Sequence, residues 1–164
     1  VTANNHSTDM GTQGVARTID VLDRYGIRHT GTFKSNENIS PLFLEKNGIT
    51  VSILNYTYGV ENMRQPKPHV VNFIGDESDI PEFDLHPKNI NFKKIGLDIN
   101  GAKKNSDKVV VFFHWGDQYK IEPNENQVSL KEFCFFHYNC NEKTKILSLA
   151  YGHFALISRL AQCS

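Results

Sequence analysis

The chain of 164 residues has no excess of either charge, because 18 Lys and Arg balance 18 Asp and Glu. Its longest basic runs are the Lys pairs at 93–94 and 103–104, so no nucleic-acid or anionic-membrane partner is indicated. No apolar stretch approaches the roughly 20 residues that span a bilayer. The sequence therefore predicts a globular domain without a transmembrane segment of its own.

Cysteine is missing from most of the chain, since all three cysteines lie between positions 134 and 163. An odd number of cysteines at one end does not form a disulfide framework, so the redox compartment stays undetermined. The first residue is Val1 rather than Met, and the residues after it already resemble the interior of a domain. A signal peptide or membrane anchor upstream of Val1 is compatible with this beginning.

Strand and helix patterns alternate along the sequence. Val15, Ile19 and Leu22 form one apolar stripe of a helix that Gly26 ends. The later segments are a β-rich stretch at 49–56 after an Asn-Gly turn, a helical stripe at 92–102, an apolar run at 109–113 and a helix from 125 capped by Asn124. This alternation predicts an α/β fold in which the apolar run is a buried strand of a parallel sheet.

Two loops that follow predicted strands contain histidine. The first is Asn4-Asn5-His6-Ser7, and the second is His114-Trp115-Gly116, directly after the apolar run. Ligands of open α/β sheets bind at the carboxyl ends of the strands, so we expect Asn5, His6 and His114 to converge at one edge. Asn oxygen and imidazole nitrogen bind divalent metals, and a further imidazole can protonate a leaving alkoxide. The set suits metal-assisted phosphoester hydrolysis.

Structural roles compete with this interpretation. A histidine at a strand end is often a hydrogen-bonded structural residue, and Asn-Asn is common in turns because Asn tolerates left-handed backbone. His29, His69 and His86 lie in polar segments, and we expect them to be solvated. Cys134, His137 and Cys140 share one helical side, but a zinc site needs a fourth ligand that this segment does not offer.

The two loops also carry a family resemblance. Ala3-Asn4-Asn5-His6-Ser7 with Asp9 and Gly11 resembles the ANNHS-x-D-x-G segment of the CapA/PgsA capsule-synthesis family, which is linked to poly-gamma-glutamate production. His114-Trp115-Gly116 with Tyr119 is similar to the family's HWG-x-E-Y signature, although Gln118 stands in place of Glu. Pro123 and Gln127 match the P-x-x-x-Q that follows. The resemblance covers residues 1 to about 133.

The resemblance implies a metallophosphoesterase-like fold, a β-sandwich of two sheets flanked by helices and here incomplete at both ends. It implies that Asn5 and His114 are ligands of divalent metal ions (Mn, Fe or Zn) and that His6 is the nearby catalytic acid or charge stabiliser. The family's opening Gly-Asp motif and its closing Gly-x-His-Pro-His motif are missing, with Gly152-His153 as the nearest remnant. We therefore expect these 164 residues alone to be inactive.

The family pattern stops abruptly after Phe133, where the cysteines begin. We interpret residues 1–133 as a partial capsule-synthesis metallophosphatase-like domain and 134–164 as a divergent or frame-shifted tail. We expect this tail to pack poorly, without rebuilding the family's next strand and final metal loop.

Two functions from different classes follow from the resemblance. The first is a divalent-metal-dependent phosphoesterase of bacterial capsule or poly-gamma-glutamate synthesis. The alternative is a non-catalytic binding or scaffold component of a polymer-export complex. Both place the protein with the capsule synthesis or export machinery, at the cell envelope or its extracellular face.

Overall fold

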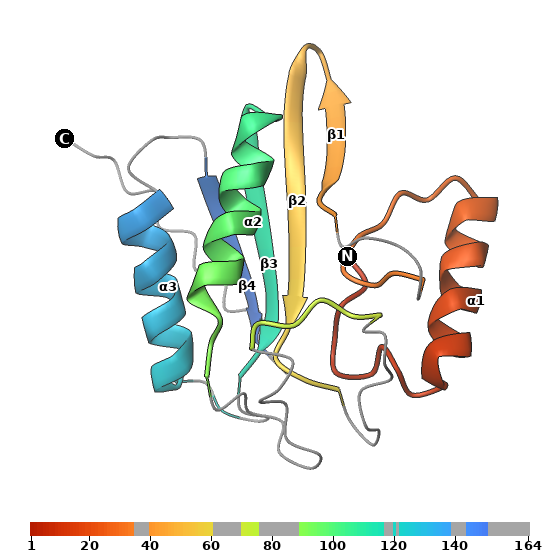
Figure 1. Cartoon of the computed structure of the whole chain (residues 1–164), viewed down its shortest axis with the longest axis horizontal. Helices are drawn as coiled ribbons and strands as arrows, with labels where there is room; N and C mark the ends of the chain where they lie inside the picture. The colour runs from red at the N-terminus through yellow and green to blue at the C-terminus, as the bar shows by residue number, and fades with distance from the viewer. Residues whose placement is uncertain are drawn as a thin grey trace.

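The computed structural model describes residues 1–34, 40–60, 70–75, 89–116, 120, 122–138 and 144–150. Helices and strands follow one another as in Figure 1: α1 (Gly11–Arg24), β1 (Leu42–Lys46), β2 (Ile49–Thr57), α2 (Phe92–Lys104), β3 (Lys108–Trp115), α3 (Glu125–Tyr138) and β4 (Thr144–Ala150). The predicted α/β class is confirmed. The described residues hold one sheet of the two that the resemblance implies.

The sheet has the strand order β1-β2-β3-β4. β1 and β2 form an antiparallel hairpin, joined by Asn47 and Gly48, both with positive φ as a tight turn between twisted strands requires. β2, β3 and β4 are parallel, so β3 is hydrogen-bonded on both sides, as its apolar run predicts. The carboxyl ends of these three strands consequently lie at one edge of the sheet, which is the lower edge in Figure 1.

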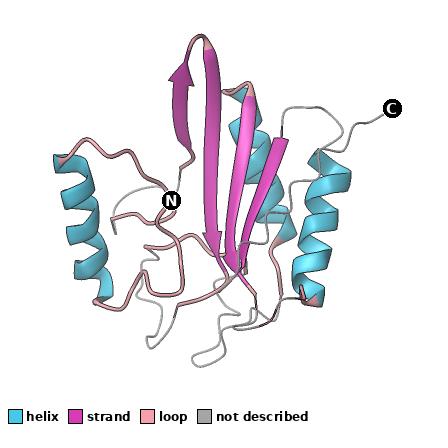
Figure 2. Ribbon diagram, turned by 180° about the vertical axis from the view of Figure 1, so that it is seen from behind, coloured by secondary structure: helices cyan, strands magenta, loops and turns pink. Residues whose placement is uncertain are grey.

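Side chains of β3 alternate between the two faces of the sheet. Those of Val109, Val111, Phe113 and Trp115 point to the face that α2 and α3 cover, which lies behind the strands in Figure 2. They pack there against Tyr56 of β2 and apolar residues of both helices, among them Ile95, Ile99 and Leu130. Phe112 and His114 face the other way. The strand thus uses one face for the core and presents the other to the N-terminal segment.

α1 lies beyond the β1 side of the sheet in both views. Its predicted stripe is buried at Val15 and Ile19, which pack with Ala3 and residues 70–73 in a second apolar cluster. The helix ends at Arg24, and Gly26, the predicted stop, follows its C-cap with φ +65°. The amides of Gly26 and Ile27 bond back into the last turn, which satisfies two carbonyl groups.

The start of α3 explains the role of Gln127 in the Pro-x-x-x-Gln pattern. Asn124 and Gln127 cap the helix reciprocally, because each backbone amide donates to the other residue's side-chain oxygen, at 2.9 and 3.0 Å. A Cβ on Gly116 would lie 2.5 Å from Gln127 Nε2, and Gly116 has φ +107°. The Gln127 side chain therefore packs directly over the glycine that follows Trp115, linking the cap of α3 to the end of β3.

The expectation for the tail was wrong in one respect. β4 begins at Thr144 and pairs in parallel with β3 over seven residues, from Val109 to Trp115. α3 also continues past Phe133, and the Cys134 side chain is fully buried in the main core. A parallel strand on the open side of β3 satisfies backbone groups that would otherwise stay unpaired. The region of Gly152-His153 lies outside the described residues.

Candidate metal and catalytic site

Asn5 and His114 meet although 109 positions separate them in the sequence. The Asn5 side-chain oxygen lies 3.0 Å from His114 Nε2. His114 stands near the carboxyl end of β3, and Asn5 belongs to the loop that opens the chain. His6 lines the same cavity. The predicted convergence of Asn5, His6 and His114 at one edge of the parallel sheet is thus present in the structure.

The N-terminal segment is held in place by buried hydrogen bonds to β2. The backbone amide of Ala3 donates to the side-chain oxygen of Asn55 at 2.7 Å, and Asn55 is 2 % exposed. The amide of Thr2 donates to the carbonyl of Thr30 at 3.0 Å. A polar side chain this deeply buried requires such partners. Asn55 matters because it anchors the segment two residues before Asn5.

Sequence reasoning did not identify Asn55 or Gly31 as positioning residues. A Cβ on Gly31 would stand 2.2 Å from Asn55 Oδ1 and 2.7 Å from the Ala3 amide nitrogen. Gly31 also has φ +107°, a conformation that side chains disfavour. Only glycine lets the Ala3 backbone and the Asn55 side chain approach residue 31 this closely. No spacing or periodicity in the sequence marks either residue, because the contacts join segments that are distant in the chain.

The two neighbouring asparagines have different roles. The Asn4 side-chain oxygen accepts from the backbone amide of His6 at 2.9 Å, which is a local Asx turn. Asn4 thus fits the structural interpretation of Asn-Asn. Asn5, at 1 % exposure, points away from this turn to His114. The turn formed by Asn4 sets the backbone so that Asn5 faces inward and His6 faces outward.

His6 lies at the exposed rim of the site. Its Nδ1 is 3.0 Å from the carboxylate of Asp9, and both side chains are almost half exposed. A carboxylate only accepts hydrogen bonds, so this contact places a proton on Nδ1. The Nε2 atom is then the one that can exchange a proton with a bound substrate. Asp9, three residues downstream, thereby fixes the ring orientation and the tautomer.

The electrostatics keep His114 uncharged. Burial lowers the pKa of His114 from its ordinary value, and the nearby charge of His6 lowers it further. The ring also stacks on Tyr58, with centroids 6.2 Å apart and planes 10° apart. A neutral imidazole is the form that binds metals, because its free nitrogen retains the lone pair. The folded protein therefore favours the uncharged form of His114, which is the form that a metal ligand requires.

This lowered pKa predicts a pH dependence of stability. The unfolded chain binds the proton near pH 6.5, the ordinary value, whereas folded His114 binds it only at lower pH. The contribution of His114 is therefore fully present above pH 6.5 and is lost as pH falls through the folded pKa. Urea unfolding of wild type and His114→Gln between pH 8 and 5 should show a smaller loss for the variant. Equal losses in both chains would contradict the assignment.

A cavity of about 340 Å³ opens beside these residues. It is lined by Val1, Ala3, Asn4, Asn5, His6, Asn55, Phe112, Phe113 and His114. Polar groups from the first loop and from β3 thus share a hollow with an aromatic wall. A volume of this size accommodates a small ligand.

The donor atoms can be compared with what a divalent ion requires. Two ligand atoms that are each about 2.1 Å from one ion and at right angles to it stand about 3.0 Å apart. In the structure the Nε2–H of His114 donates a hydrogen bond to Asn5 Oδ1 across 3.0 Å, so an ion that took the place of this proton would find the two atoms at the required spacing. No group of three or more His, Cys, Asp or Glu that could hold a metal occurs among the described residues. The described part thus fits two neutral ligands of one ion.

Two of the other sequence candidates can be assessed. Cys134 is buried against core residues, and burial raises its pKa to about 12, which disfavours the thiolate that zinc binding requires. His29 is not solvated as expected, because its side chain is only 15 % exposed and its Nε2 lies 3.2 Å from Asp23. His69 lies outside the described residues, as do His86 and Cys140.

Comparison with known proteins decides the family. The family described as bacterial capsule synthesis protein PGA_cap matches residues 1–135, which include both histidine loops. The chain belongs to this family. The predicted resemblance to the capsule-synthesis and poly-gamma-glutamate family is thereby confirmed.

Two curated relatives share the PGA_cap region at low identity. The capsule biosynthesis protein CapA of Bacillus anthracis is 29% identical over 131 residues, which cover 78% of this chain and 29% of the relative. The PGA biosynthesis protein CapA of Bacillus subtilis (strain 168) is 27% identical over 130 residues, covering 78% of this chain and 30% of the relative. The matched part of the PGA_cap chain thus spans under a third of either relative.

The helices of the described residues were also compared with the requirements of a membrane span. None of them combines the length and the apolar character that a crossing helix needs.

Proposed function

We propose that this PGA_cap chain contributes to divalent-metal-dependent hydrolysis of a phosphoester in capsule or poly-gamma-glutamate synthesis. The observation that carries the proposal is the 3.0 Å approach of the Asn5 oxygen to His114 Nε2, at the sheet edge where ligands of α/β proteins bind. The printed names of both CapA relatives support the biosynthetic setting. The proposed location is the cell envelope or its outer face, alongside the capsule machinery.

The residues of the site have different proposed roles, which follow from where they lie. Asn5 and His114 would hold a Mn, Fe or Zn ion, whose chemistry when bound is Lewis-acid polarisation of the phosphoryl group. Exposed His6, with a proton on each ring nitrogen, would donate its Nε2 proton to the leaving alkoxide, while Nδ1–H stays hydrogen-bonded to Asp9. The half-buried position of His114 and the aromatic wall of Phe112 limit water around its nitrogen.

One observation favours the scaffold alternative. Among the described residues that line the cavity with Asn5 and His114, none is an Asp or a Glu. Two close cations need negative ligands to offset their repulsion, and neither Asn5 nor His114 carries charge. A domain that keeps the fold with a weakened site would serve binding rather than catalysis. The affinity of the protein for a divalent metal ion distinguishes the catalytic function from the scaffold function.

Calorimetric titration with Mn²⁺ tests the proposal on residues 1–164. We expect at most one ion to bind, weakly, because only two neutral ligands are in place. Binding should disappear in His114→Ala, and activity on a generic phosphoester should be negligible in both chains. The matched control is His29→Ala, which removes an imidazole outside the site and should leave Mn²⁺ binding unchanged. Tight binding of two ions would show that the ligands are wrongly assigned, and unaltered binding by His114→Ala would reject the site.

A further inference from the structure

Asn72 lies at the centre of a buried hydrogen-bond network beside β2. It belongs to residues 70–75, the yellow-green segment at the carboxyl end of β2 in Figure 1, and it is 2 % exposed. Its backbone amide donates to the carbonyl of Gly31 at 2.9 Å, and its backbone carbonyl accepts from the amide of Thr57 at 2.9 Å. The main chain of Asn72 therefore joins β2 to residues 28–33.

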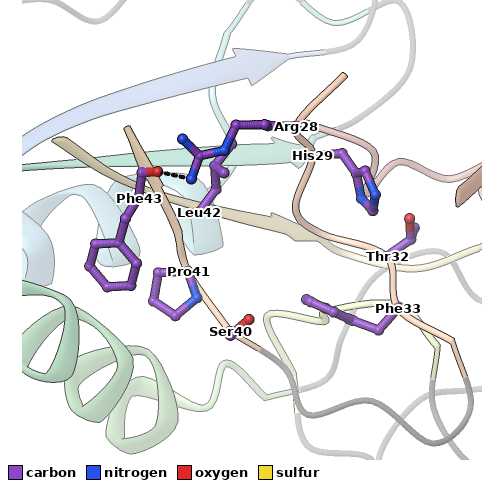
Figure 3. Close-up of a pocket in the computed structure, with 8 residues that line it drawn as sticks. All are labelled: Arg28, His29, Thr32, Phe33, Ser40, Pro41, Leu42 and Phe43. Carbon is purple, nitrogen blue, oxygen red and sulfur yellow. Dashed lines mark hydrogen bonds between the residues drawn. The ribbon is translucent and has the colours of Figure 1, made fainter. Parts of the chain in front are cut away.

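Residues 28–33 are also joined to the chain around the start of β1. The Arg28 guanidinium donates to the carbonyl of Phe43 (Figure 3). The Thr30 hydroxyl donates to the carbonyl of Ser40 at 3.0 Å. Contacts of the fold itself therefore fix this segment.

The side chain of Asn72 is held in one orientation. Its oxygen accepts from the Lys94 ammonium at 2.7 Å, and its NH₂ group donates to the backbone carbonyl of Asn55 at 3.0 Å. An ammonium offers only donors and a carbonyl only accepts, so the reversed amide would lose both contacts. The backbone and side-chain polar groups of Asn72 are thus all paired, as deep burial requires.

Lys94 is itself held in place on α2. Its ammonium lies 3.0 Å from a carboxylate oxygen of Asp98 and 4.8 Å from the centre of the Tyr56 ring. The Tyr56 hydroxyl donates to the same Asp98 oxygen at 2.8 Å. An anion, an aromatic face and an amide oxygen together define one position for the ammonium. α2 therefore supplies a fixed donor to Asn72.

Asn55 connects this network to the proposed metal site. Its backbone carbonyl accepts from Asn72, and its side-chain oxygen accepts from the Ala3 amide at 2.7 Å. Ala3 precedes Asn5 by two residues, and the Asn5 oxygen lies 3.0 Å from His114 Nε2. The carbonyl and the side chain of Asn55 share one Cα, so a shift of the carbonyl also moves the oxygen that anchors Ala3.

We propose that Asn72 and Lys94 are positioning residues of the metal site. Lys94 orients the Asn72 amide, Asn72 holds the Asn55 carbonyl, and Asn55 anchors the segment that presents Asn5. Neither Asn72 nor Lys94 lines the cavity at the site, so both act through other residues. Their role in metal binding rests on the function proposed above, whereas their hold on Asn5 is independent of any ion.

Lys94→Met tests the proposal through the sign of its effect on Mn²⁺ binding. Loss of a positive charge alone would favour binding of a cation slightly, whereas loss of the donor to Asn72 should weaken it. We expect about tenfold weaker Mn²⁺ binding, measured by electron paramagnetic resonance of the free ion. Lys94→Arg restores the charge and the N–H donors and should recover most of the affinity.

Lys93→Met is the matched control, because it removes the same charge from an exposed neighbour on α2. It should leave Mn²⁺ binding unchanged or slightly stronger. Unaltered or stronger binding by folded Lys94→Met would overturn the proposal. So would equal weakening by Lys93→Met, or an Lys94→Arg chain as weak as Lys94→Met.

Hydrogen exchange of the Ala3 amide is a measurement that needs no ion. Asn72→Asp keeps an acceptor for Lys94 but lacks the NH₂ group, so it serves even where Lys94→Met does not fold. In folded variants the Ala3 amide should exchange about tenfold faster than in wild type, while the Val111 amide in β3 keeps its protection. Unchanged exchange at Ala3, or equal acceleration at Val111, would overturn the proposal.

The two measurements also distinguish this proposal from the proposed function. A wild-type chain that binds no Mn²⁺ would reject the metal function, and selective acceleration at Ala3 in the variants would still support the positioning role. A wild-type chain that binds Mn²⁺, with unchanged affinity and unchanged Ala3 exchange in the variants, would retain the metal function and reject Asn72 and Lys94 as positioning residues.

Discussion

Gly31→Ala should lower the free energy of unfolding by about 4 kcal/mol, combining backbone strain with loss of a buried hydrogen bond. The added Cβ would stand 2.2 Å from the Asn55 oxygen that accepts from Ala3, so that bond cannot survive unchanged. Because Ala3 anchors the segment that presents Asn5, the substitution should also separate Asn5 from His114. Urea unfolding measures the first effect, and loss of the Mn²⁺ response measures the second.

Gly26→Ala is the matched control for this substitution. Gly26 also has positive φ, at +65°, but a Cβ there meets nothing within 4 Å. It should therefore cost only the conformational strain, about 1 kcal/mol, and leave the site intact. Similar costs at Gly26 and Gly31 would show that the contact with Asn55 contributes little.

His114→Ala and His6→Ala should separate binding from proton transfer in a longer chain that includes the sequence flanking residues 1–164. Loss of His114 removes a metal ligand, so both the ion and the phosphoesterase activity should be lost. Loss of His6 should keep the ion and lower kcat by a factor of about 10²–10⁴, the usual contribution of a general acid. Metal content by mass spectrometry and steady-state kinetics on the same samples provide both values.

Asp9→Asn refines the result for His6. The amide retains the shape of Asp9 but lacks its negative charge, so it stabilises the doubly protonated His6 ring less and weakens it as a proton donor. An intermediate loss of kcat with unchanged metal content is expected. A longer chain that folds, binds no metal and still supports polymer production would favour the scaffold function.

Much of the sheet could be predicted because its signals are local. The apolar run at 109–113 marked a strand buried between two neighbours, and the stripe of Val15 and Ile19 marked α1. Ligands of α/β sheets bind at the carboxyl ends of the strands, and this rule also predicted that His114 and Asn5 lie at one edge of the sheet. These inferences depend on side-chain periodicity and strand direction, which a single segment already contains.

The supporting contacts could not be predicted because they join distant segments. Asn55 is an ordinary polar residue in a β-rich stretch until Ala3, 52 positions away, donates to its side chain. In the sequence Gly31 is an ordinary turn glycine, and only the contact with Asn55 in the folded chain distinguishes it. His29 looked solvated because its neighbours in sequence are polar, whereas its surroundings in space are not. β4 was missed because loss of the family pattern does not remove the capacity to pair with β3.

The location of the metal ion can be measured by Mn²⁺ broadening of NMR signals in residues 1–164. The side-chain NH₂ of Asn5 and the ring C–H signals of His114 should broaden first, at Mn²⁺ concentrations well below the protein concentration. Signals of His29, which does not line this cavity, should persist. Broadening that spares Asn5 and His114, or that continues undiminished in His114→Ala, would contradict the assignment of these two residues as partners at one ion.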